Sequence, residues 1–192
     1  MTVGLLYRGM QPNATSPTLV TERLTLRPHV RADFEESAAM WADEGVTRFI
    51  GGRPSTAEEC WQRLLRYGGL WPLFGFGYWV VRETATGRFA GEVGFANFRR
   101  ELDPPFGDTP EMGWALAPWA HGQGFASEAV QAAAAWADAQ GLDRTVCMIS
   151  PDNTPSMRVA EKAGYREYAR TEFKGSPTVL FERPIPRNPE AA

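Results

Sequence analysis

Residues 111–140 read EMGWALAPWAHGQGFASEAVQAAAAWADAQ, and this stretch decides the fold. Its start, Glu111 to Leu116, has the length and composition of a strand, and Pro118 ends the strand because proline lacks the backbone donor that a sheet ladder needs. The apolar positions that follow share one helical face: Phe125, Ala129, Ala132, Ala133 and Trp136. The stretch therefore predicts a strand, a glycine-bearing turn and a helix from Phe125 to Gln140.

The turn between the strand and the helix contains Gly122 and Gly124. Because glycine has no side chain, the backbone can turn tightly there and point successive N–H groups into one concavity, beside the positive end of the helix. Such a turn can bind an anion, for example a pyrophosphate. A plain strand-to-helix connection has the same pattern, so the glycines alone leave both interpretations open. No P-loop motif occurs, and the absence of G-x-G-x-x-G disfavours a dinucleotide-binding fingerprint.

The rest of the chain alternates between strands and short helices. Polar and apolar residues alternate from Arg23 to Arg27, which predicts a half-buried strand. Asp33 is expected to cap one helix, and Ser55 or Thr56 to cap a second. The expected buried faces are Phe34, Ala38, Trp41 and Ala42 in the first helix and Trp61, Leu64 and Leu65 in the second. Further strands are expected over residues 77–82, 89–96, 144–150, 165–171 and 178–182, with a helix over 155–163. This order indicates an α/β or α+β sheet domain.

Length and charge limit the classes of protein. The chain has 192 residues, 43% of them hydrophobic, which is enough for one substantial core. Its 20 Lys and Arg residues against 23 Asp and Glu residues argue against nucleic acid or an anionic membrane as the partner, since both need a concentrated basic surface. We expect one domain over residues 18–183, with loose ends at 1–17 and 184–192 that are rich in proline and small polar residues.

The cysteines and the uncharged segments point to a cytoplasmic protein. Cys60 and Cys147 are too few for a disulfide framework and lack the paired spacing of a zinc site, so no metal is expected. The first residues do not have the pattern of a signal peptide. The longest uncharged stretch, residues 68–81, contains Pro72 and is too short to span a membrane.

Five blocks of the sequence resemble one family. They are TERLTLRP at 21–28, GEVGF at 91–95, EMGWALAP with HGQGFASEA over 111–129, NTPS at 153–156 and EKAGYR at 161–166. In this order they are similar to the GNAT superfamily of N-acetyltransferases, and within it to the branch typified by the ribosomal-protein N-terminal acetyltransferases RimJ and RimL. The resemblance implies a mixed, strongly twisted sheet with helices on both faces, splayed between its fourth and fifth strands to admit acetyl-CoA.

The resemblance also implies how acetyl-CoA would bind. The family's Q/R-x-x-G-x-G/A motif, whose backbone amides hold the pyrophosphate, corresponds here to His121, Gly122, Gln123, Gly124, Phe125 and Ala126, followed by Ser127. The two amides of pantetheine would pair with the backbone around Trp114 and Leu116 like an added strand. Asn153 would contact the arm of the cofactor. His121 departs from the family pattern, which usually has Gln or Arg there.

Acetyl transfer to an amine needs a proton acceptor, and the leaving thiolate needs a proton donor. The resemblance offers two carboxylates as the base: Glu111, at the start of the central strand, and Glu172, before the last hairpin; Glu92 ranks behind them, and a water chain is a further option. Many family members have a tyrosine acid on the helix after Asn153. This chain has Ser156 there, whose hydroxyl would lie near the sulfur as in the RimL-like branch.

The sequence does not identify the amine acceptor. A protein N-terminus, an aminoglycoside, a polyamine and an amino acid all stay open. The loop over residues 98–107 is expected to border the acceptor site, where Glu101, Asp103 and Asp108 would form an acidic groove for a cationic amine. An aromatic cluster lies nearby in sequence, and core packing explains most such clusters: Trp71, Phe74, Phe76, Tyr78 and Trp79.

Two other classes of function compete with an acetyltransferase. One is a non-catalytic module that binds acyl-CoA as a sensor, for which the missing tyrosine is the only hint. The other is a structural domain with an empty cleft. A homodimer is compatible with exposed strand edges, although nothing in the sequence specifies one.

Overall fold

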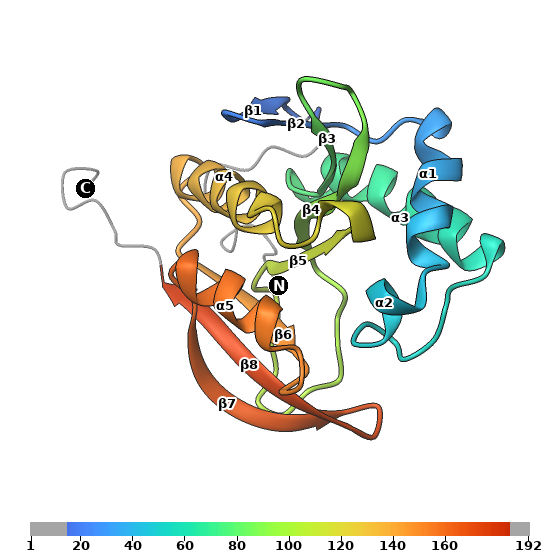
Figure 1. The fold of residues 1–192 in the computed structure, drawn as a ribbon. Helices are drawn as coiled ribbons and strands as arrows, with labels where there is room; N and C mark the ends of the chain where they lie inside the picture. Colours follow the sequence, from blue (N-terminus) through green and yellow to red (C-terminus); the bar gives the residue numbers. More distant parts are fainter. Residues whose placement is uncertain (1–14, 185–192) are drawn as a thin grey trace.

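A computed structural model describes residues 15–184 of the chain. Its centre is a mixed, eight-stranded sheet with the strand order β1-β2-β3-β4-β5-β6-β8-β7 (Figure 1). The strands are β1 Leu19–Val20, β2 Leu24–Arg27, β3 Tyr78–Glu83, β4 Phe89–Ala96, β5 Glu111–Leu116, β6 Arg144–Ile149, β7 Arg166–Phe173 and β8 Ser176–Pro184. All neighbouring strands are antiparallel except β5 and β6. The predicted strands are confirmed, and β1 is an addition that the sequence did not indicate.

Helices cover both faces of this sheet (Figure 1). They are α1 Phe34–Trp41, α2 Glu44–Thr47, α3 Ala57–Phe74, α4 Phe125–Ala139 and α5 Thr154–Lys162, with 3-10 turns at Arg31–Asp33 and Pro118–Ala120. Side chains along β4 alternate between the two faces of the sheet, so successive residues contact different helices. The Glu92 carboxylate is hydrogen-bonded by α1, whereas Val93 and Phe95 lie in the core cluster that contains α4. The expected fold class is confirmed.

The sheet opens between β5 and β6. The two strands run parallel and pair only at Glu111 and Val146, where the Val146 amide donates to the Pro110 carbonyl at 3.0 Å. After this point β5 has no strand partner on its β6 side in the described residues. These are the fourth and fifth of the strands expected from the sequence, so the predicted splay is confirmed.

Three tryptophans join the sheet to helices α3 and α4. Trp71 of α3, Trp79 of β3 and Trp136 of α4 pack edge to face, with ring centroids 4.9 to 5.4 Å apart. Such pairs add to the stability that area burial gives. The aromatic cluster seen in the sequence is therefore mainly core, and Tyr78 alone among its members lines the large cavity described below.

Helix α3 begins as expected but presents a different face. The Thr56 side chain accepts from the Glu59 amide, and the Glu59 carboxylate reaches back to the Thr56 amide, which forms a capping box. The buried positions are Cys60, Leu64, Tyr67, Leu70 and Trp71, whereas Leu65 is 59% exposed. The predictions of Trp61, which is 37% exposed, and of Leu65 as core residues were wrong, because the helix continues to Phe74 and its longer apolar stripe excludes both positions. Ala42 was also predicted to be buried but is exposed, since α1 ends at Trp41.

Asp33 precedes α1 without capping it through its side chain. Its carboxylate instead accepts from the Arg27 and Arg82 guanidinium groups and from the Val30 amide. The expected cap is therefore wrong, and the residue ties α1 to strands β2 and β3. Burial alone would raise the pKa of Asp33, but these hydrogen bonds outweigh burial and lower the pKa from 3.8 to about 2.

The lowered pKa of Asp33 predicts a pH-dependent stability. An acid with a depressed pKa contributes stability above its unfolded pKa and loses it as the pH falls toward the folded value. We expect Asp33→Asn to lower the free energy of unfolding by about 2 kcal/mol at neutral pH, and the gap to wild type to shrink as the pH falls from 3.8 toward about 2. Urea unfolding across this pH range measures it. Glu36→Gln is the control, because Glu36 pairs with the same Arg82 from an exposed position; an equal loss in both variants would contradict the account.

Candidate active site

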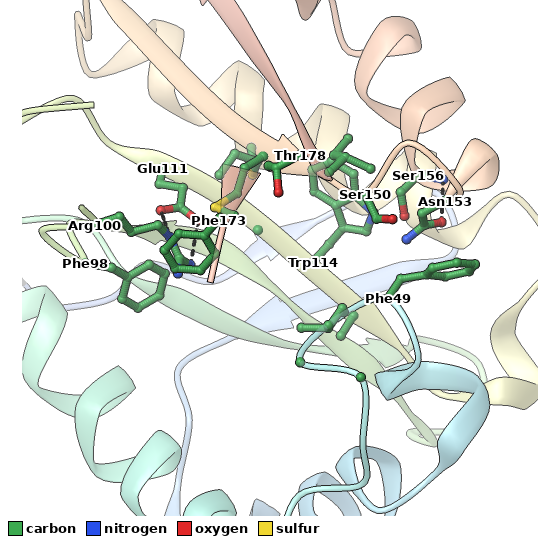
Figure 2. Close-up of a pocket in the computed structure, with 18 of the residues that line it drawn as sticks. Phe49, Phe98, Arg100, Glu111, Trp114, Ser150, Asn153, Ser156, Phe173 and Thr178 are labelled. Carbon is green, nitrogen blue, oxygen red and sulfur yellow. Dashed lines mark hydrogen bonds and ion pairs between the residues drawn. The ribbon is translucent and has the colours of Figure 1, made fainter. Parts of the chain in front are cut away.

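A cavity of about 620 Å³ lies where β5 and β6 part. Its walls come mainly from α1 and α3, from β4, β5 and β6, from the loops after α2 and β4, from the start of α5 and from the β7–β8 hairpin. Figure 2 shows Glu111 and Arg100 at one end of it, Asn153 and Ser156 at the other, and Trp114 between them. A volume of this size is typical of small-molecule sites.

The glycine turn before α4 leaves backbone donors open. Gly122 and Gly124 have φ angles of 73° and 81°, which glycine adopts without strain. Gly124 is the N-cap of α4 and supplies no capping side chain, and the first intrahelical bond is that of the Glu128 amide. The amides of residues 125–127 are therefore without an intrahelical acceptor at the positive end of the helix. This geometry fits an anion such as a pyrophosphate.

Arg23, which directly precedes β2, contacts this turn. Its guanidinium donates to the Gln123 carbonyl at 2.9 Å and to the Glu128 carboxylate at 2.8 Å, and it lies 4.7 Å from the centroid of the Phe125 ring. Glu128 also accepts from the Thr21 hydroxyl at 2.6 Å. These contacts tie the turn to the start of β2 and to the first turn of α4.

The open side of β5 presents unpaired backbone groups. The Ala117 amide donates to the Ala90 carbonyl of β4, and bonding directions alternate along a strand. Trp114 and Leu116 therefore point their backbone groups away from β4, toward the gap. The Leu116 carbonyl is 2.8 Å from the His121 Nε2, whereas the backbone of Trp114 has no strand partner on that side among the described residues.

Asn153 and Ser156 sit at the start of α5 and line the cavity. The Asn153 side-chain oxygen accepts from the Ser156 amide at 3.2 Å, so asparagine caps the helix. The serine hydroxyl does not serve as the cap, and Figure 2 shows it beside Asn153 at the edge of the cavity. Asn153 directly precedes the helix and Ser156 lies in its first turn, as the sequence predicted.

Glu111 is buried at the point where the strands part. The Arg100 guanidinium binds it in bidentate fashion, with N–O distances of 2.6 and 2.8 Å (Figure 2). Burial raises the pKa of Glu111 above its ordinary value, and the hydrogen bonds and charge of Arg100 offset only part of that effect. A carboxylate has about four lone-pair sites, so the pair leaves Glu111 able to accept a further proton or hydrogen bond.

The other two carboxylates are less suited to accept a proton in the cavity. Glu92 accepts from Ser37 at 2.6 Å and from Trp41 at 2.9 Å, and lies 3.5 Å from His29. Burial alone would raise the pKa of Glu92, but His29, Ser37 and Trp41 together lower it. Glu172 is exposed on β7 and does not line the cavity, although its neighbour Phe173 does.

The prediction of an acidic groove beside the acceptor is wrong. Glu101, Asp103 and Asp108 do not line the cavity, and Asp108 pairs with Arg99. The loop that contains them does border the site, through Phe98 and Arg100. Sequence reasoning missed Arg100 and the other basic residues of the cavity, because they come from segments that only the fold brings together.

Neither a metal centre nor a membrane span is found in residues 15–184. No group of three or more His, Cys, Asp or Glu side chains in this part of the chain could hold a metal ion. None of its helices has the length and apolar character needed to cross a membrane. Cys60 and Cys147 are buried free thiols.

Comparisons with known proteins place the chain in a family. The model of the acetyltransferase (GNAT) domain matches residues 23–166. The uncharacterized N-acetyltransferase p20 of Bacillus licheniformis is 30% identical over 157 residues, covering 78% of this chain and 83% of p20. A protein from Bordetella pertussis assigned to GnaT-family acetyltransferases has a similar structure, with a TM-score of 0.78 and 36% identity over 88% of this chain and 99% of that one. An acetyltransferase from Agrobacterium tumefaciens strain C58 gives a TM-score of 0.76 and 30% identity, over 88% and 94% of the two chains. The chain belongs to the GNAT acetyltransferase family.

The ion pair between the half-buried Arg100 and the buried Glu111 predicts a strong energetic coupling between the two side chains. Removing one partner of a buried ion pair leaves the other charge without compensation. We expect Arg100→Met to lower the free energy of unfolding by about 3 kcal/mol, and the double variant Arg100→Met, Glu111→Gln to recover most of that loss. Chemical unfolding of the four proteins in this cycle measures the coupling. Additive losses would contradict a buried pair.

Proposed function

We propose that the protein transfers the acetyl group of acetyl-CoA to a primary amine while it holds both substrates. The observation that carries this proposal is the open edge of β5, which begins at a cavity with a buried carboxylate and is followed in the chain by the glycine turn. A spermidine N-acetyltransferase from Vibrio cholerae, solved in complex with CoA and spermine, has the same fold, with a TM-score of 0.68 and 16% identity. That likeness supports the fold and leaves the substrate to be derived from this chain's own residues.

Acetyl-CoA fits the open groups of the site. Its pyrophosphate would accept from the amides of residues 125–127, above Gly122 and Gly124. The pantetheine amides would pair with the free backbone of Trp114 as an added strand, and the Asn153 side chain would contact the arm. Because His121 already engages the Leu116 carbonyl, pairing at Leu116 is limited to its amide unless the imidazole moves.

The chemistry needs one proton acceptor and one proton donor. Glu111 takes a proton from the ammonium form of the acceptor, directly or through a water. The neutral nitrogen then bonds to the thioester carbonyl carbon and the carbon–sulfur bond breaks. The nitrogen loses a second proton, which passes through water to the group that has protonated the leaving thiolate. The Ser156 hydroxyl, which lines the cavity and is not used as the helix cap, is the proposed donor to sulfur. Glu111 is preferred to Glu172 because it is buried in the cavity and its pKa is raised.

The proposal also includes the branch of the family, the bounds of the domain and the location of the protein in the cell. The placement of Asn153 and Ser156 on one cavity wall supports the RimJ/RimL-like branch. We also propose a single domain over residues 18–183 and a cytoplasmic location, the latter because the chain carries two free buried cysteines. The parts of residues 1–17 and 184–192 expected to be loose lie almost wholly outside the described residues.

A substitution in the glycine turn before α4 is expected to weaken cofactor binding selectively. Gly124→Ala forces a side chain onto a residue with φ of 81°, which costs about 1–2 kcal/mol and shifts the amides that follow. We expect the Kd for acetyl-CoA to rise at least about tenfold in calorimetric titration. Gly87→Ala is the matched control, because Gly87 has φ of 74° in the β3–β4 hairpin and open space around its Cα. Equal affinity in the two variants would mean that the turn does not hold the cofactor.

The choice of base predicts opposite results for two glutamates. Glu111→Gln should lower kcat by about 100-fold or more while acetyl-CoA still binds, because removal of a general base has an effect of this order. Glu172→Gln should leave kcat within about twofold, since that side chain lies outside the cavity. Thiol release with an amine panel measures both. The reverse order would reassign the base, and acetyl-CoA binding without thiol release by wild type would favour the sensor module.

A further inference from the structure

The cavity is basic, although the whole chain has a formal net charge of −3. Five cationic side chains line it against the two carboxylates Glu92 and Glu111: Arg48, Arg63, Arg66, Arg100 and Lys174. Arg100 is neutralised by Glu111, and Glu92 is held by Ser37, Trp41 and His29. Within residues 15–184, none of the other four cations forms an ion pair with a carboxylate.

Arg63 is the best-placed of these cations to bind a ligand. Its guanidinium lies 3.7 Å from the centroid of the Trp41 ring, which fixes the plane of the group. Its Nη1 is buried and has no hydrogen-bond partner in the described structure. A buried donor without an acceptor is costly, and a carboxylate oxygen in the cavity would satisfy it. Arg66 lies one turn further along α3, with its guanidinium carbon 5.2 Å from the centroid of the Phe98 ring. Both arginines therefore line the same wall of the cavity.

The cations come from three separate segments. Arg48 follows α2, Arg63 and Arg66 belong to α3, and Lys174 forms part of the β7–β8 turn. None belongs to the glycine turn, where the phosphates of the cofactor are expected, and the turn does not line this cavity. The positive charge is therefore separate from the proposed phosphate site and lines the cavity that the acceptor would share with the end of the cofactor arm.

We infer that the acceptor is a small primary amine that also carries a carboxylate, such as a free amino acid, and that Arg63 and Arg66 bind this carboxylate. The inference rests on the proposed acetyl transfer and narrows its substrate class. A polyamine or an aminoglycoside would bring several positive charges into a cavity that already has unpaired cations. A carboxylate-bearing amine places its negative end on the arginines and leaves its nitrogen free to face Glu111.

The test compares acceptors that differ in one charge. Twenty L-amino acids are offered beside their neutral carboxamides, with spermidine, kanamycin and a tripeptide bearing a free N-terminus. Two signals are recorded: thiol release from acetyl-CoA, and calorimetric binding to the protein–CoA complex. We expect one or more free acids to exceed their own amides by about tenfold or more in both signals, because one charge-assisted contact is lost in the amide.

Single variants test whether Arg63 and Arg66 bind the carboxylate of the acceptor. Arg63→Gln and, separately, Arg66→Gln should reduce the acid-to-amide ratio at least about fivefold, whereas Arg31→Gln, an exposed arginine outside the cavity, should preserve it. Arg66 is exposed, so that variant keeps the test valid if loss of the Trp41 stack unfolds the Arg63 variant. Loss of acetyl-CoA affinity in these variants with an unchanged ratio would assign the arginines to the cofactor and overturn the inference.

The two signals separate failure of the inference from failure of the proposed function. Thiol release with the amides, the polyamine, the aminoglycoside or the tripeptide in preference to free acids would retain acetyl transfer and overturn the carboxylate site. Arg63-dependent binding of free acids without thiol release would support the carboxylate site while contradicting catalysis. Absence of binding by every free acid to the CoA complex would overturn the inference.

Discussion

The single bridge between β5 and β6 is the constraint on which the rest of the structure depends. Where two parallel strands continue side by side, their backbone groups satisfy one another, and nothing can enter between them. Here they pair only at Glu111 and Val146, so the remaining edge of β5 keeps open donors and acceptors inside the molecule. An unpaired edge is costly unless a ligand or water completes it. An extended ligand that carries amides would form hydrogen bonds with these unpaired backbone groups.

The elements around this gap are arranged to hold it open. The three packed tryptophans fix α4 against the sheet on one side, while Asp33 and the Glu92 contacts fix α1 on the other. Arg23 then sets the turn through which β5 enters α4. Rigid elements of this kind position a binding site more accurately than loops do. The basic lining of the cavity comes instead from loops and one helix face, where specificity can change without disturbing the cofactor side.

The sequence predicted the parts of the site whose signal is local. The strand Glu111–Leu116 and the start of α4 at Phe125 were found at their observed bounds, because a strand-like composition, a proline stop and a helical apolar face all lie within one segment. Asn153 and Ser156 followed from a short motif. The cationic cavity was not predicted, since Arg48, Arg63 and Lys174 meet only in the fold, and Asp33 was taken for a cap because its partner Arg82 is far along the chain. Side-chain direction at Glu172 depends on the β7–β8 register, which the sequence does not state.

The proposed function depends above all on acetyl-CoA lying along the open edge of β5 with its phosphates on the first amides of α4. Backbone amide NMR of the labelled protein, with and without acetyl-CoA, tests this placement directly. We expect the amide signals of Trp114 and of residues 125–127 to shift strongly, and these amides to exchange more slowly with solvent, when the cofactor is present. Saturable binding that leaves these amides unchanged, or shifts confined to the arginines of the cavity, would contradict it.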